Sequence, residues 1–250
     1  MSTSPRFFPA SQAFPSHGAD ALPARVTGVL RAPRPTFTAI AQSPRWIGVL
    51  ALTLAVTFLC RAVLLETEVG RLALVDQWEH NAVAFGQPVD DARYAAFARA
   101  SEYGALYAGL TSLASGPVLV FGLSLLLIAV FNGMLGGTAT YGQVVAVVAH
   151  AGVILALRQA IAAPLDYARE TLASPTTLTV FFPMLGEASP LARFLGIIDV
   201  FVVWWATALA IGIAVLYRRR AGLVVAGFTG TYVAAAALLT LAMALAGGTA

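Results

Sequence analysis

The sequence has few charged residues and no lysine. Of its 250 residues only 11% are charged, all 15 basic residues are arginine, and 59% of the chain is hydrophobic. A soluble globular domain carries about 25% charged and about 45–50% apolar residues. A chain with mean hydropathy +0.80 cannot hide its side chains in one aqueous core. The composition therefore excludes an ordinary soluble domain and predicts an all-α, polytopic membrane protein.

Cysteine is almost absent, and so are the motifs of known chemistry. The single Cys60 excludes an intramolecular disulfide and a metal site built on several cysteines. The sequence contains no HExxH, CxxC or GxSxG motif and no phosphate loop ending in GK[ST]. It therefore predicts no catalytic residue, no metal and no cofactor, and it makes a membrane enzyme the least favoured class.

The basic residues do not indicate nucleic-acid binding, although the isoelectric point is near 9.4. The arginines are spread along the chain rather than clustered on one soluble domain, which is the distribution of membrane topology signals. Arginine without lysine, together with many alanines, is typical of a high-GC bacterial genome. We therefore expect no nucleic-acid partner and a bacterial inner-membrane location.

The N-terminus lacks the apolar core of a signal peptide. Residues 1–24 contain four prolines and no apolar run of 7–15 residues. This composition predicts a disordered, weakly basic tail, and we expect the membrane domain to occupy residues 25–247.

Long apolar runs are what the sequence has in abundance. A transmembrane helix needs about 20 mostly apolar residues. Five runs meet this length, and they predict a five-helix bundle with spans at about 46–65, 110–131, 143–163, 194–217 and 223–246. The third run is the most polar, because it carries His150, Arg158 and Gln159. We interpret His150 as a hydrogen-bonding residue in helix packing.

The arginines predict which way the bundle faces. With five spans, the N-terminal segment and the loops 132–142 and 218–222 share one side, which holds eight arginines and one aspartate. The opposite side holds five arginines and ten acidic residues. Positive residues accumulate on the cytoplasmic side. We therefore expect a cytoplasmic N-terminus and a periplasmic C-terminus.

Two segments outside the spans are expected to be ordered. Residues 25–45 alternate apolar side chains with arginines and prolines, a pattern of short helices lying on the cytoplasmic membrane surface. A disordered basic linker is the alternative. In the external loop 66–109, Asp90 is suited to an N-cap and Asp91 to the first helical turn. We expect a helix that starts there and runs on into the second span.

Three ionisable residues fall at one depth in the predicted bundle. Counting about 1.5 Å per residue places Arg61, Arg158 and Asp199 each about 22 Å from the inner face of a core about 30 Å thick. An unpaired charge at the bilayer centre costs roughly 2.5–3.5 kcal/mol on insertion scales. We therefore expect Asp199 to pair with Arg158, Arg61 or both. The layer is either a structural salt bridge or the site of an ion relay or a headgroup.

Several segments taken together resemble one known family. The stretch "IIDVFVVWWATALAIGIAVLYRRR" resembles the fourth-span signature of the Yip1 domain family, and "NGMLGGTATYGQVVAVVAHAGVILAL" resembles its turn and third span. The segments "RVTGVLRAPRPTFTAIAQSPRW" and "ETLASPTTLTVFFP" are similar to the family's lead-in and to a loop of its bacterial members. The positions that carry the motif are Gly136, Gly137, Asp199, Phe201, Trp204 and Gly212.

The resemblance covers about residues 25–245 and implies a five-span bundle with a cytoplasmic N-terminus. Eukaryotic members are tied to Rab-type GTPases and vesicle traffic, but nothing recognisable in residues 1–24 offers a GTPase-binding segment. The family supplies no established catalytic residue.

Two functions remain open from the sequence. The first is a non-enzymatic membrane organiser or adaptor, which acts through the lipid bilayer, other membrane proteins or a second copy of itself. The alternative is a small transporter, channel or lipid-handling protein that uses the layer of Arg61, Arg158 and Asp199. A dry, fully paired layer would favour the organiser, and a cavity that reaches the layer would favour the alternative.

Overall fold

The computed structural model describes residues 21–84, 86–186 and 189–247. Within these ranges the chain is all-helical, and its only β-type pairing is an isolated bridge between Thr177 and Asp199. The predicted tail lies mostly outside the described residues. Its last three residues, 22–24, belong to the first helix rather than to a disordered segment.

Four helical segments are long and apolar enough to cross a membrane, as expected of an integral membrane protein. They correspond to the first, second, third and fifth predicted spans. They are α3 (Ile47–Glu66), α6 (Gly104–Ile128) with its π-helical continuation η1 (Ala129–Met134), the α7–α8 pair (Tyr141–Ala151 and Val153–Arg169) and α11 (Ala221–Gly247).

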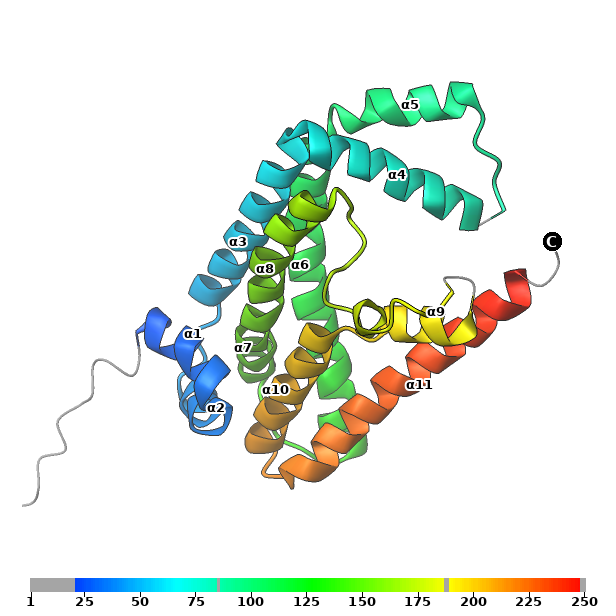
Figure 1. Cartoon of the computed structure of the whole chain (residues 1–250). Coiled ribbons are helices and arrows are strands. Elements are labelled where there is room, and N and C mark those ends of the chain that lie inside the picture. The colour runs from blue at the N-terminus through cyan, green and yellow to red at the C-terminus, as the bar shows by residue number, and fades with distance from the viewer. Residues whose placement is uncertain (1–20, 85, 187–188, 248–250) are drawn as a thin grey trace, which may run out of the picture.

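The α7–α8 segment forms the centre of the bundle. Its most apolar stretch is 67% buried inside the protein, whereas the corresponding stretches of α3, α6 and α11 are only 11–17% buried. Residues 144–151 are buried without exception. Figure 1 shows the other long helices arranged around this segment, with α11 crossing at an angle on the far side of α10. The central helix contacts protein, and the outer helices are left to contact lipid.

The fourth predicted span, 194–217, is not one helix. A short helix, α9 (Pro190–Ile197), is followed by two residues of extended backbone, and α10 (Val200–Leu216) begins after them. The prediction of a continuous helix is wrong because the backbone around Asp199 pairs with another segment. Leu178 N donates to Ile198 O at 2.9 Å, and Val200 N donates to Thr176 O at 3.1 Å. With 17 residues, α10 is about 26 Å long.

The predicted N-terminal helices exist, but they are part of the core. They are α1 (Leu22–Arg31) and α2 (Pro33–Gln42), each with a proline in its first turn. Val29, Phe37 and Ile40 are at most 1% exposed, because the hairpin packs against α7 and α10. Gln143 Nε2 also donates to Ala41 O at 3.0 Å. The hairpin therefore closes one end of the bundle (Figure 1).

The opposite end of the bundle carries two further helices (Figure 1). One is α5 (Asp91–Ser101), whose N-cap is Asp90 as predicted, with Arg93 N donating to Asp90 Oδ1 at 2.8 Å. It ends before α6 begins at Gly104 instead of running on into it. The other is α4 (Glu68–Ala84), which the sequence analysis missed because this segment has no clear amphipathic pattern.

At each of the three glycines of the motif, a side chain would be sterically unfavourable. Gly136 has a φ of +68°, where a side chain would be strained. A Cβ on Gly137 would lie 2.4 Å from the ring of Tyr217, and one on Gly212 would lie 2.6 Å from Val147 Cγ1 and 3.0 Å from the Phe37 ring. These contacts hold the turn between α6 and α7 against the end of α10, and α10 against α7 and α2.

The close approach at Gly212 yields a stability prediction. Gly212→Ala should lower the melting temperature of the purified protein in mild detergent, because overpacking of a buried site costs about 1–3 kcal/mol. Gly230→Ala is the matched control, since a Cβ there meets nothing within 4 Å and alanine favours a helix interior. Equal melting temperatures for the two variants would contradict the packing of α10 on α7.

Candidate functional site

Asp199 and Arg158 form a salt bridge inside the bundle. Arg158 Nε lies 2.8 Å from Asp199 Oδ2, and the side chains of Asp199 and Arg158 are 5% and 27% exposed. Arg158 belongs to α8, and Asp199 precedes the first residue of α10. Of the two arginines expected to pair with Asp199, Arg158 is the one that the structure places on it.

The second carboxylate oxygen of Asp199 caps α10. Asp199 Oδ1 accepts from Phe201 N at 2.8 Å and from Val202 N at 3.3 Å. The backbone N of Asp199 donates to the hydroxyl of Tyr232 on α11, which in turn donates to Ile197 O. A carboxylate at a helix N-terminus is favoured by free N–H groups and by the helix dipole. Asp199 is therefore an N-cap as well as an ion-pair partner.

Two hydroxyls from a loop complete the network, and the sequence analysis missed them. Thr176 Oγ1 donates to Asp199 Oδ2 at 2.6 Å. Ser174 Oγ accepts from Arg158 Nη2 at 2.8 Å and donates to Asp199 Oδ2 at 3.2 Å. Non-helical backbone at membrane depth is tolerated where it is buried in protein. The loop bearing Ser174 and Thr176 is half-buried, and its backbone pairs with the break before α10.

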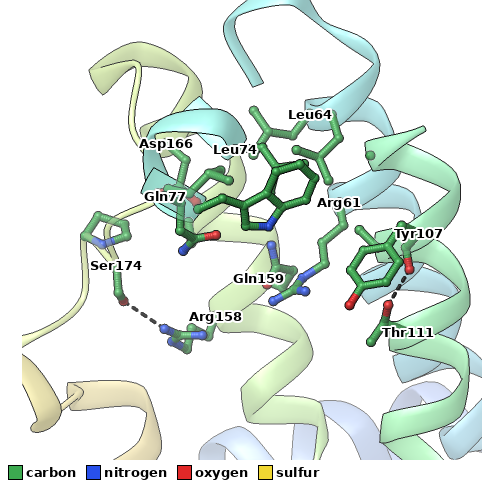
Figure 2. A pocket seen from close by; sticks show the side chains of 17 residues that line it. Arg61, Leu64, Leu74, Gln77, Tyr107, Thr111, Arg158, Gln159, Asp166 and Ser174 are labelled. Atoms are coloured by element: carbon green, nitrogen blue, oxygen red, sulfur yellow. Dashed lines mark hydrogen bonds between the residues drawn. The ribbon is translucent and has the colours of Figure 1, made fainter. Parts of the chain in front are cut away.

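Arg61 occupies a different position from the other two residues of the predicted layer. It extends from α3 toward Gln159 and Arg158 rather than toward the end of its own helix (Figure 2). It forms no hydrogen bond or ion pair with any residue that the structure describes. Arg158 and Asp166 are the charged groups whose fields act on it. The expected pairing of Arg61 with Asp199 is therefore not present.

A cavity of about 230 Å³ lies between α3, α4, α6 and α8, and Arg158 is one of its lining residues (Figure 2). Arg61, Arg158, Gln159 and Asp166 line it from α3 and α8. Helix α4 covers it with Leu74, Gln77 and Trp78, α6 contributes Tyr107 and Thr111, and the loop contributes Ser174. Charged, amide, hydroxyl and aromatic groups thus converge on one hollow at the end of the bundle that carries α4.

Asp166 is the second charged residue of this cavity without a direct partner. It is 8% exposed, and its Oδ1 is buried with no hydrogen-bond partner among the described residues. Sequence analysis placed Asp166 in the external loop, because the predicted third span ended at residue 163. The helix continues to Arg169, which brings Asp166 under α4.

Other residues considered from the sequence lie outside this site. His150 is 1% exposed on α7, with Nδ1 placed 2.7 Å from Ala146 O in its own helix. Phe201 and Trp204 contact each other with ring centroids 6.0 Å apart. Among the residues that the structure describes, no three His, Cys, Asp or Glu side chains come together as metal ligands would.

The Arg158–Asp199 network yields a double-mutant prediction. Asp199→Asn keeps a good N-cap residue but leaves Arg158 without its counter-charge, so it should destabilise the protein by about 1–3 kcal/mol. Adding Arg158→Gln should recover much of that loss. Asp199→Ala should cost about 1 kcal/mol more than Asp199→Asn, because it also removes the cap. Thermal unfolding in detergent measures these three variants and Arg158→Gln alone, and strictly additive losses in the double mutant would contradict the pairing.

Comparisons with known proteins add no relative. The chain was matched against protein-family models, curated proteins and solved structures, and none of the three gives a match.

Proposed function

We propose that the chain is a non-enzymatic, five-span membrane protein of the Yip1 type that binds a ligand at its charged cavity, as a lipid-handling protein or small transporter does. The quoted motif segments support the family, and the glycines at 136, 137 and 212 occupy sterically restricted positions. The apolar helix α10 supplies the fifth crossing. Its short length is extended at one end by the half-buried loop that pairs with it and by α9.

The cavity is the main observation that supports this proposal. A dry, fully paired layer would favour an organiser, but the cavity reaches Arg158, and Arg61 has no hydrogen-bond or ion-pair partner in the part of the chain that the structure describes. Ionisable residues inside a membrane are costly and mark functional sites by default. Arg158 has its counter-charge in Asp199, so structural pairing accounts for those two residues. It does not account for Arg61, which faces the hollow.

The distribution of polar groups favours binding over ion conduction. Below the cavity, residues 144–151 of α7 are buried, and all of them except His150 are valine or alanine. A conducting pore needs polar or water-filled lining along its whole length. The charged lining of the cavity therefore does not continue along α7, which supports a binding pocket open to one side.

An organiser or adaptor remains the second candidate. The saturated Arg158–Asp199 network and the buried α1–α2 hairpin support a rigid scaffold. The outer faces of α3, α6 and α11 carry many exposed apolar side chains, and these faces suit lipid, other membrane proteins or a second copy of the chain.

We place the protein in the inner membrane of a bacterium, with its N-terminus in the cytoplasm and its C-terminus in the periplasm. The support is the arginine asymmetry, with Arg218, Arg219 and Arg220 at the turn between α10 and α11. The cavity then faces the periplasm.

The topology is tested with reporter fusions. A reporter after Gly247 should be active as a periplasmic enzyme, and one inserted at residues 218–222 should be active as a cytoplasmic one. If α10 does not cross the membrane, only four spans remain, and the N- and C-termini lie on the same side. A C-terminal fusion that reports cytoplasm would therefore contradict the five-span topology.

Water access to the cavity is tested with single cysteines in a Cys60→Ser background. Thr111→Cys should react with a charged, membrane-impermeant thiol reagent added from the periplasmic side, because Thr111 lines the cavity. Leu110→Cys is the control at the same depth, since Leu110 is 60% exposed without lining the cavity and faces lipid. Equal, negligible labelling of both would favour the organiser instead.

A further inference from the structure

The cavity holds two charged groups of opposite sign that do not satisfy each other. The Arg61 guanidinium carries five N–H donors and has no hydrogen-bond or ion-pair partner among the described residues. Asp166 Oδ1 is buried without a donor. The two groups interact only through their fields, so each is available to a molecule in the cavity.

A buried acceptor and an intramembrane cation both lose free energy when they have no partner. A purely anionic ligand would satisfy Arg61 and place like charge beside Asp166. A purely cationic ligand would satisfy Asp166 and place like charge beside Arg61 and Arg158. A molecule with an anionic oxygen at one position and a hydrogen-bond donor at another satisfies both groups, and a cationic N–H donor also supplies the counter-charge of Asp166.

The geometry points to a zwitterionic ligand that carries a phosphate and a primary ammonium, as a phosphoethanolamine headgroup does. This assignment rests on the proposed function, in which the cavity is a ligand site. The phosphate accepts hydrogen bonds from Arg61, whose planar fork matches its oxygens. The ammonium donates to Asp166. Trp78 and Tyr107, which also line the cavity, offer aromatic surface to the cation.

The size of the cavity fits a headgroup rather than a whole amphiphile. Pockets for drug-sized ligands measure about 300–1,000 Å³, and this cavity measures about 230 Å³. The polar end of a lipid would therefore enter, and its chains would stay outside.

An apolar groove provides a place for those chains. A hollow of about 510 Å³ lies between α3 and α8, and Leu64 lines both it and the cavity. Its lining is almost entirely apolar and includes Leu59, Val63, Ala160, Ala163 and Pro164. A charged cavity adjoining an apolar groove is the pattern of a site for an amphiphile. The same headgroup chemistry could also reach the cavity as a free, water-soluble molecule.

The test measures lipid binding to the full-length protein by native mass spectrometry from mild detergent. The probes are phosphatidylethanolamine, phosphatidylcholine and phosphatidylglycerol with identical acyl chains, and soluble glycerophosphoethanolamine. We expect phosphatidylethanolamine to bind at least about tenfold more tightly than the other two lipids. Phosphatidylcholine has no N–H to donate to Asp166, and phosphatidylglycerol has no ammonium. Binding of soluble glycerophosphoethanolamine as tight as that of the lipid would support the headgroup chemistry and identify a water-soluble source.

Two variants separate the two halves of the site. Arg61→Gln should weaken phosphatidylethanolamine binding by about tenfold or more, the effect expected from loss of a charge-assisted hydrogen bond. Asp166→Asn should instead remove the preference for phosphatidylethanolamine over phosphatidylglycerol. Arg99→Gln and Asp76→Asn are the matched controls, because both residues are exposed at the same end of the bundle and line no part of the cavity. If Arg61→Gln does not accumulate, Arg61→Lys and Asp166→Asn carry the test.

Two different sets of results would contradict the ligand assignment alone or the binding function as well. Equal or tighter binding of phosphatidylglycerol or phosphatidylcholine, with Thr111→Cys still labelled, would overturn the assignment of a ligand with a phosphate and a primary ammonium and leave the proposed binding function standing. Absence of binding by every probe, together with an unlabelled Thr111→Cys, would overturn both.

Discussion

The fold depends on one residue, Asp199, which has three structural roles. Asp199 pairs with Arg158, caps α10 and, through its backbone, anchors the break in the fourth apolar segment to a loop and to α11. A polar loop and an interrupted helix are costly in a membrane unless their backbone groups are paired. This network pairs the backbone groups of the loop and of the break. Arg158 belongs to the network and also lines the cavity.

The elements that rest on side-chain periodicity and length could be predicted from the sequence. The four long spans lie within a few residues of their predicted ends, and Asp90 caps its helix as expected. Counting residues along the spans predicted that Arg158 and Asp199 would meet, and they do, although the count for Asp199 assumed a continuous helix that the structure interrupts before α10.

The features that depend on tertiary contact could not be predicted. The break at Ile198–Asp199 arises because Thr176 and Leu178 pair with it, and no local pattern in that apolar run announces a distant partner. The cavity needs α4 as its cover, and α4 has no strong apolar stripe, although Thr67 caps it by accepting from Gly70 N at 3.0 Å. Asp166 was assigned to a loop because hydropathy falls before the helix ends. In each of these three cases, contacts between distant segments determine the structure, and the local composition does not indicate them.

The N-terminal hairpin has a consequence for how the protein is made. Phe37 and Ile40 leave the ribosome early, yet the surfaces that bury them belong to α7 and α10, which are synthesised more than a hundred residues later. Until α10 is inserted, these side chains have only the membrane surface to cover them. The end of the bundle that carries the α1–α2 hairpin is therefore completed near the end of synthesis. A chain that stalls before α10 exposes an apolar hairpin by which quality-control proteases can recognise it.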